Sequence, residues 1–130
     1  MAKTVAEKLL IKPNSTVWSL PAAGLDRIGP LPEGATRVAD PGVATTVFVF
    51  ADDAAALRAA LAAHGDRIVR AGVIWVAYPK GGRADINRDS VWPILGEYGL
   101  RPIGQVAVDD VWSALRFRPL AEGEAPFTGR

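Results

Sequence analysis

The 130-residue chain contains no cysteine and only one histidine, and its apolar runs are all short. The lack of cysteine excludes disulfides, thiolate nucleophiles and cysteine-ligated metal sites. A transition-metal site would therefore depend on carboxylates, and no spacing of acidic residues indicates one, so we predict no metal. A membrane helix needs about 20 successive apolar residues, and no stretch of this sequence provides them.

The chain also lacks an excess of charge of either sign, because 15 basic residues are set against 14 acidic ones. This balance gives no electrostatic reason to expect nucleic acid or a membrane as a partner. Glu7 and Lys8 interrupt the apolar stretch that a secretion signal needs, so we expect a cytoplasmic protein. The length suits a single domain, which we place at 1–118, followed by a flexible tail at 119–130.

Short apolar segments rich in β-branched and aromatic residues alternate with segments of helical character. The former predict buried strands, and the last two strands are separated only by Asp109-Asp110, which is hairpin spacing. The strands are predicted at 16–20, 35–38, 45–51, 72–78, 100–108 and 111–118. One helix should begin after Asp52 as its N-cap and end near Gly65, and another should begin near Asn87 or Asp89 and end at Gly99.

This order predicts a three-layer α/β fold of the Rossmann type, with a mostly parallel sheet, helices on both faces and a C-terminal antiparallel hairpin. Over residues 15–118 it resembles a shortened class I methyltransferase-like fold. One helix–strand unit of that fold is missing after the strand that ends at Val38. A shared topology by itself implies little about activity.

Four segments carry a narrower resemblance. They are 8–13, 29–34, 75–80 and 109–117. The residues in these segments, and the order of the segments, resemble a family of small bacterial proteins catalogued as a domain of unknown function. This resemblance implies no particular activity. The resemblance does point to two shared features, the corner Tyr78-Pro79-Lys80 and the strand that carries Asp109, Trp112, Ser113 and Arg116.

The first strand-to-helix turn is where a dinucleotide or S-adenosylmethionine enzyme would hold its glycine-rich loop. Here that stretch has one glycine, Gly24, and Pro21 lacks a backbone N–H donor. S-adenosylmethionine is the cofactor that the fold would suggest, but without this loop we predict no cofactor. Nothing in the sequence marks a catalytic residue, and His64 beside Gly65 is typical of a helix C-terminus.

Several residues are nevertheless placed where such sheets bind ligands. Asp52 follows a strand at its carboxyl end, although helix capping would require the same residue type. Lys80 and Arg83 flank Gly81-Gly82, and cations beside flexible amides suit a phosphate or carboxylate, whereas a solvated basic loop is the alternative.

The last strand supplies the remaining candidates for ligand binding, which are Asp109, Trp112, Ser113 and Arg116. Trp112 and Arg116 are predicted to share one face, and a packed Trp beside an Arg paired with a carboxylate is the alternative.

Taken together, the sequence favours a non-catalytic methyltransferase-like binding or interaction domain. The alternative is a protein or enzyme that binds a nucleotide-like or other anionic small molecule at the carboxyl edge of the sheet around Lys80. A further hypothesis is a homo-oligomer joined along the terminal hairpin, whose outer strand would be an exposed edge.

Overall fold

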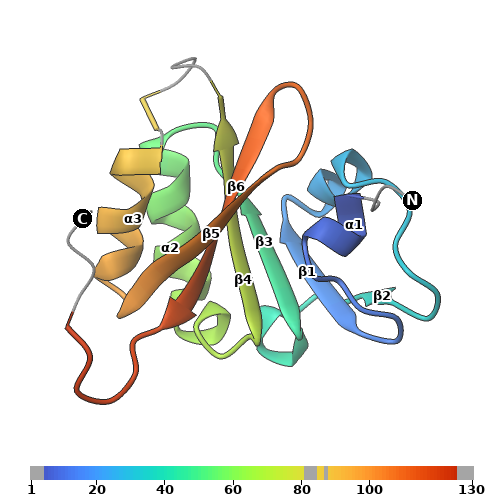
Figure 1. Cartoon of the computed structure of the whole chain (residues 1–130), viewed down its shortest axis with the longest axis horizontal. Coiled ribbons are helices and arrows are strands. Elements are labelled where there is room, and N and C mark those ends of the chain that lie inside the picture. Colours follow the sequence, from blue (N-terminus) through green and yellow to red (C-terminus); the bar gives the residue numbers. More distant parts are fainter. Residues whose placement is uncertain (1–4, 81–84, 87, 126–130) are drawn as a thin grey trace.

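The computed structural model describes residues 5–80, 85–86 and 88–125, and its centre is a six-stranded sheet in the order β2-β1-β3-β4-β6-β5 (Figure 1). Strands β1 to β4 run parallel, whereas β6 pairs antiparallel with both β4 and β5. The bounds are β1 Thr16–Leu20, β2 Thr36–Arg37, β3 Thr46–Phe50, β4 Val73–Pro79, β5 Leu100–Ala107 and β6 Trp112–Pro119. A mostly parallel sheet with a terminal antiparallel hairpin confirms the predicted fold class.

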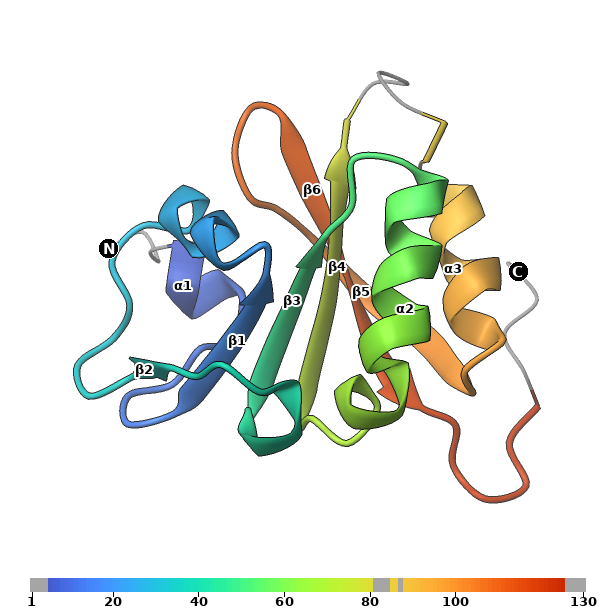
Figure 2. The same ribbon diagram turned by 180° about the vertical axis from the view of Figure 1, so that it is seen from behind.

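Helices lie on both faces of this sheet. The long helices α2 (Ala54–Ile68) and α3 (Arg88–Gly96) pack on one face. The short helix α1 (Val5–Lys8) and the 3-10 helix η1 (Ala22–Arg27) pack on the other face (Figure 2). No helix within the described ranges is both long enough and apolar enough to cross a membrane.

The central strands are buried on both sides, as their continuous apolar sequences predict. Every residue of β3 is buried, and Phe48 and Phe50 point into the core beneath α1 and η1. Trp75 of β4 enters the same core, and its Nε1 donates a hydrogen bond of 2.9 Å to the carbonyl of Leu9. This buried bond ties the segment after α1 to the middle of the sheet.

The fold is reduced in the first half of the chain. The segment after β1 forms only the six-residue η1, and the strand predicted at 35–38 contributes two residues to the sheet, Thr36 and Arg37. From β2 the chain passes through the 3-10 helix η2 (Pro41–Val43) directly into β3. Consequently the face that α1 and η1 cover has much less helix than the face under α2 and α3.

The N-terminus of α2 corrects one detail of the sequence interpretation. The capping residue is Asp53, whose Oδ1 accepts a hydrogen bond of 2.7 Å from the amide of Ala56. Asp85 caps a second amide, because its Oδ1 accepts from Ala54 N at 2.9 Å. The prediction that Asp52 is the N-cap is therefore wrong.

The end of α3 and the chain after β6 also differ in detail from the prediction. Helix α3 begins at Arg88 and ends at Gly96, and Gly99, with φ +76°, turns the chain into β5. Pro119 belongs to β6, and Leu120 N donates to the carbonyl of Gly99 at 2.9 Å. The tail expected to be flexible from residue 119 is thus hydrogen-bonded at its start, while residues 126–130 and Asn87 lie outside the described residues. The domain boundary at 118 stays a prediction.

Candidate functional site

The carboxyl ends of β1, β3 and β4 meet at one edge of the sheet because these strands are parallel. β6 begins at the same edge, since Trp112 is the register partner of Pro79. Lys80 N continues this pairing and donates a hydrogen bond of 2.7 Å to the carbonyl of Val111. The Tyr78-Pro79-Lys80 corner and the start of β6 at Trp112 therefore lie side by side at the edge where such sheets place their ligands.

A cavity of about 150 Å³ opens at this edge. It is lined by Pro21, Ala23, Gly24, Arg27, Phe50, Asp52 and Trp112. Two residues chosen from the sequence, Asp52 and Trp112, are among them. Asp52 is exposed, and Trp112 is 5% exposed, so the cavity has a polar mouth and an aromatic inner wall.

The aromatic wall is built from residues of two strands. The rings of Phe50 and Trp112 meet edge to face, with centroids 5.4 Å apart and planes at 75°. Arg27 Cζ lies 5.2 Å from the centroid of the Trp112 ring, at cation–π distance. Sequence reasoning missed Arg27 and Phe50, because one lies in a weakly helical segment and the other reads as an ordinary core residue of β3.

Phe50 also fills the space above the first strand-to-helix turn. A methyl group at Gly24 would lie 2.5 Å from Phe50 Cδ1, which is closer than a Cβ atom approaches in folded proteins, and at a tight 3.0 Å from Ser19 Oγ. The hydroxyl of Ser19 donates a hydrogen bond of 2.7 Å to the carbonyl of Pro21 within the turn. The absence of a side chain at Gly24 thus leaves room for the phenyl ring.

These observations test whether the turn fits S-adenosylmethionine. Clefts that bury a drug-sized ligand usually have volumes of about 300–1,000 Å³, several times that of a benzene-sized cavity. Here the cavity is about 150 Å³, Pro21 offers no amide, and Phe50 lies against Gly24. The described residues around the first turn do not fit the cofactor.

The remaining predicted residues are divided between this edge and the rest of the hairpin. Asp109 Oδ1 accepts hydrogen bonds from Val111 N at 2.8 Å and from Trp112 N at 2.7 Å, so this oxygen closes the turn between β5 and β6. Ser113 is 5% exposed, and its Oγ accepts from Gln105 Nε2 at 3.0 Å. Neither residue lines the cavity.

Lys80 is half-buried beside this edge, whereas Arg83 lies outside the described residues, so the anion-binding loop stays a prediction. Arg116 is four residues along β6 from Trp112 and faces Trp75 of β4. The structure therefore brings Asp52 and Trp112 together at the cavity and places Arg116 away from it. Among the residues described, no group of three or more His, Cys, Asp or Glu side chains could hold a metal ion.

Comparison of the whole structure with solved structures shows a Rossmann-like, methyltransferase-like fold. A protein of the NADB-Rossmann superfamily from Streptococcus agalactiae matches with a TM-score of 0.56 at 9% identity, over 98% of this chain and 71% of that chain. The M1A22 tRNA methyltransferase TrmK of B. subtilis matches with a TM-score of 0.55 at 10% identity, over 96% and 71%.

A third similar structure is that of a Streptococcus pneumoniae protein proposed to be a tRNA (m1A22) methyltransferase. It gives a TM-score of 0.57 at 4% identity, over 99% of this chain and 74% of that chain. At such identities the similarity shows the fold alone. No family model matches the sequence, and no curated protein is significantly similar to it.

Proposed function

We propose that this chain is a non-catalytic binding domain built on a methyltransferase-like fold. The observation that carries the proposal is the Phe50 ring, which occupies the space over the first strand-to-helix turn. In a fold of this kind, ligands bind at the carboxyl edge and approach the backbone of that turn. Here a protein side chain approaches it instead. The narrower resemblance to a bacterial domain family stays a prediction and implies no particular activity.

The most direct test is a calorimetric titration of the intact protein with S-adenosylmethionine and with S-adenosylhomocysteine. We expect no binding heat for either compound at 1 mM, a probe concentration about 100 times a Kd on the order of 10 μM. Phe50→Leu is the matched variant, because it shortens the side chain over Gly24 while keeping an apolar residue in the core. Micromolar binding to the unaltered protein would overturn the proposal.

A second candidate function is the binding of one small molecule in the cavity of about 150 Å³ at the carboxyl edge of the sheet. Arg27 and Asp52 both line it and carry opposite charges, and within the described part of the chain neither takes part in an ion pair. A cavity of this volume accepts a molecule about the size of benzene. A nucleotide is much larger, and a phosphate dianion would be repelled by Asp52, so a small zwitterion is the ligand that the charges favour.

This second candidate can be tested with three compounds of similar shape. L-valine carries both charges, isovalerate lacks the ammonium group, and isobutylamine lacks the carboxylate. If Arg27 and Asp52 act together, L-valine should perturb the Trp112 fluorescence at lower concentration than either singly charged compound. The variant Asp52→Asn should remove the advantage of L-valine over isovalerate. Equal responses to all three compounds would refute a zwitterion site.

A further inference from the structure

Three arginines lie on one face of the terminal hairpin, and we call Arg101, Arg116 and Arg118 the arginine row. Arg101 of β5 and Arg118 of β6 are direct register partners, so their side chains leave the sheet on the same side. Arg116 precedes Arg118 by two residues on β6 and therefore shares that face, about 7 Å away along the strand. This is the face opposite α2 and α3, because Leu115 and Phe117 of β6 point into the core beneath those helices.

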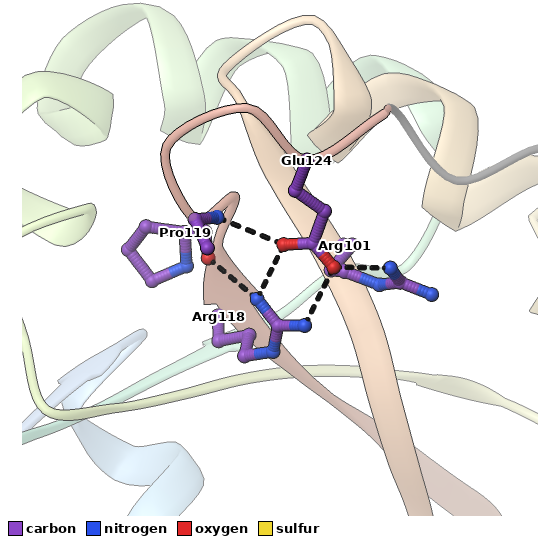
Figure 3. Close-up of polar contacts among 5 residues, drawn as sticks. Arg101, Arg118, Pro119 and Glu124 are labelled. Carbon is purple, nitrogen blue, oxygen red and sulfur yellow. Dashed lines mark hydrogen bonds and ion pairs between the residues drawn. The ribbon is translucent and has the colours of Figure 1, made fainter.

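Two like charges directly opposite each other in a sheet repel, so this pair requires an anion. Glu124 supplies one (Figure 3). Both terminal nitrogens of Arg118 donate to its carboxylate at 2.8 Å, Arg101 Nη1 donates to Oε2, and Ala121 N donates to Oε1 at 2.8 Å. The bonds from Arg118, followed by those from Ala121 and Arg101, hold the pKa of Glu124 far below its ordinary value.

The ion pairs of Glu124 are with Arg101 and Arg118, and they do not include the third arginine of the row, Arg116. Arg116 takes part in no ion pair with the described residues, and its Nε is buried without a hydrogen-bond partner. Its register partner on β5 is Gly104, and a methyl group placed there would meet no atom within 4 Å. Arg116 therefore carries a positive charge that no carboxylate of the described residues neutralises, beside an open part of the sheet face.

Glu124 shows how a peptide can present a carboxylate to this face. It lies in the short segment after β6, where Glu124 N donates to the carbonyl of Ala121 at 2.9 Å. Residues 121–123 of this segment are exposed, so the segment contributes little to the core. An external peptide with two acidic residues at alternate positions would match the spacing of Arg118 and Arg116, since side chains i and i+2 of an extended strand are about 7 Å apart.

We propose that the arginine row is a docking surface for an acidic peptide segment of a partner protein, in which one carboxylate replaces Glu124 and a second one pairs with Arg116. The inference rests on the proposed role as a binding domain and names its partner class. It does not depend on the cavity, which lies at the opposite end of β6 near Trp112.

The test measures the affinity of the unaltered 130-residue chain for a capped peptide, Ala-Glu-Ala-Glu-Ala, by calorimetry. Glu124→Gln removes the internal competitor and should raise this affinity at least tenfold relative to the unaltered chain. Arg116→Gln, which leaves the bonds of Glu124 in place, should weaken peptide binding several-fold in either background. The control peptide Ala-Gln-Ala-Gln-Ala should not bind.

Three results would overturn this inference. They are an unchanged affinity in Glu124→Gln, equal binding of the glutamine peptide, and binding of inorganic phosphate to Glu124→Gln as tight as that of the acidic peptide. If Glu124→Gln does not fold, the peptide affinities of Arg116→Gln and the unaltered chain still test the inference. Equal affinities of these two proteins for the acidic peptide would contradict the role of Arg116. Because the titration with S-adenosylmethionine reports on the other end of the sheet, the two proposals can fail separately.

Discussion

The substitution Gly24→Ala tests the close packing of Phe50 over the first turn. Exchanging glycine for alanine in a helical segment ordinarily stabilises a protein by about 0.4–1 kcal/mol. Here the added methyl group would lie 2.5 Å and 2.7 Å from two ring carbons of Phe50. The ring cannot move away freely, because it packs edge to face on Trp112 and stacks on Phe48 at 6.1 Å. We therefore expect Gly24→Ala to destabilise the fold by about 1–3 kcal/mol.

A double-mutant cycle isolates the contact. Phe50, which is 7% exposed, should cost about 3 kcal/mol when it is replaced by alanine. In the double variant the methyl group enters the space that the ring vacates, so the two losses should not add. A favourable coupling of roughly 1–2 kcal/mol is expected, well above the ~0.5 kcal/mol scatter seen for independent sites.

Urea unfolding followed by tryptophan fluorescence measures all four free energies of unfolding by linear extrapolation. Gly96→Ala is the matched control, because a methyl group there meets no atom within 4 Å, and it should show the ordinary stabilisation of about 0.4–1 kcal/mol. Additive losses in the cycle, or a Gly24→Ala protein as stable as the parent, would show that Phe50 does not occupy this space.

Three further predictions concern the rest of the chain. Because the pKa of Glu124 is lowered, the stability that Glu124 adds over Glu124→Gln should be full above its ordinary pKa of 4.5 and decline as the pH falls below it, which urea unfolding at several pH values can measure. Trp75→Phe should cost about 1–3 kcal/mol and increase amide exchange in the segment near Leu9, because the buried carbonyl of Leu9 loses its donor. Asp53→Ala should lower the free energy of unfolding by about 1 kcal/mol while Asp52→Ala changes it little, since only the former caps α2.

The fold could be predicted from the sequence because its strongest signals are local. The continuous apolar runs at β3 and β4 predict central strands, and the alternation of strands with helices predicts the parallel sheet. The first half was harder, because the segment 22–28 has weak helical character and forms only a 3-10 helix. Helix boundaries were also imprecise, since adjacent aspartates such as Asp52 and Asp53 are chemically equivalent caps and only the backbone geometry selects one.

The candidate site could be predicted only in part. Strand order brings Asp52 and Trp112 to one edge, because β3 runs parallel to β4 and the antiparallel strand β6 begins where β4 ends. The roles of Phe50 and Arg27 could not be predicted, because they depend on contacts between segments far apart in the sequence. The same holds for Glu124, which the sequence places in a loose Gly- and Pro-rich tail.

Self-association through the terminal hairpin stays a prediction. The geometry of the outer strand of that hairpin affects whether a second copy can pair with it. β5 is the outer strand of the sheet, but Pro102 removes a backbone donor and the pairing shifts register between Pro102 and Gly104. Prolines and bulges on an edge strand disfavour the addition of another strand. Light scattering at high protein concentration would detect a dimer, and a monomer mass would exclude assembly along this edge.

The central claim is that protein side chains occupy the part of the fold where a methyl donor would bind. A titration of the isotopically labelled protein with S-adenosylmethionine, followed by amide NMR, examines that place directly. The account predicts that the amides of Gly24, Phe50 and Asp52 keep their chemical shifts at millimolar ligand. Saturable shifts of these amides at micromolar ligand would contradict it and would show that the chain binds the cofactor at this turn.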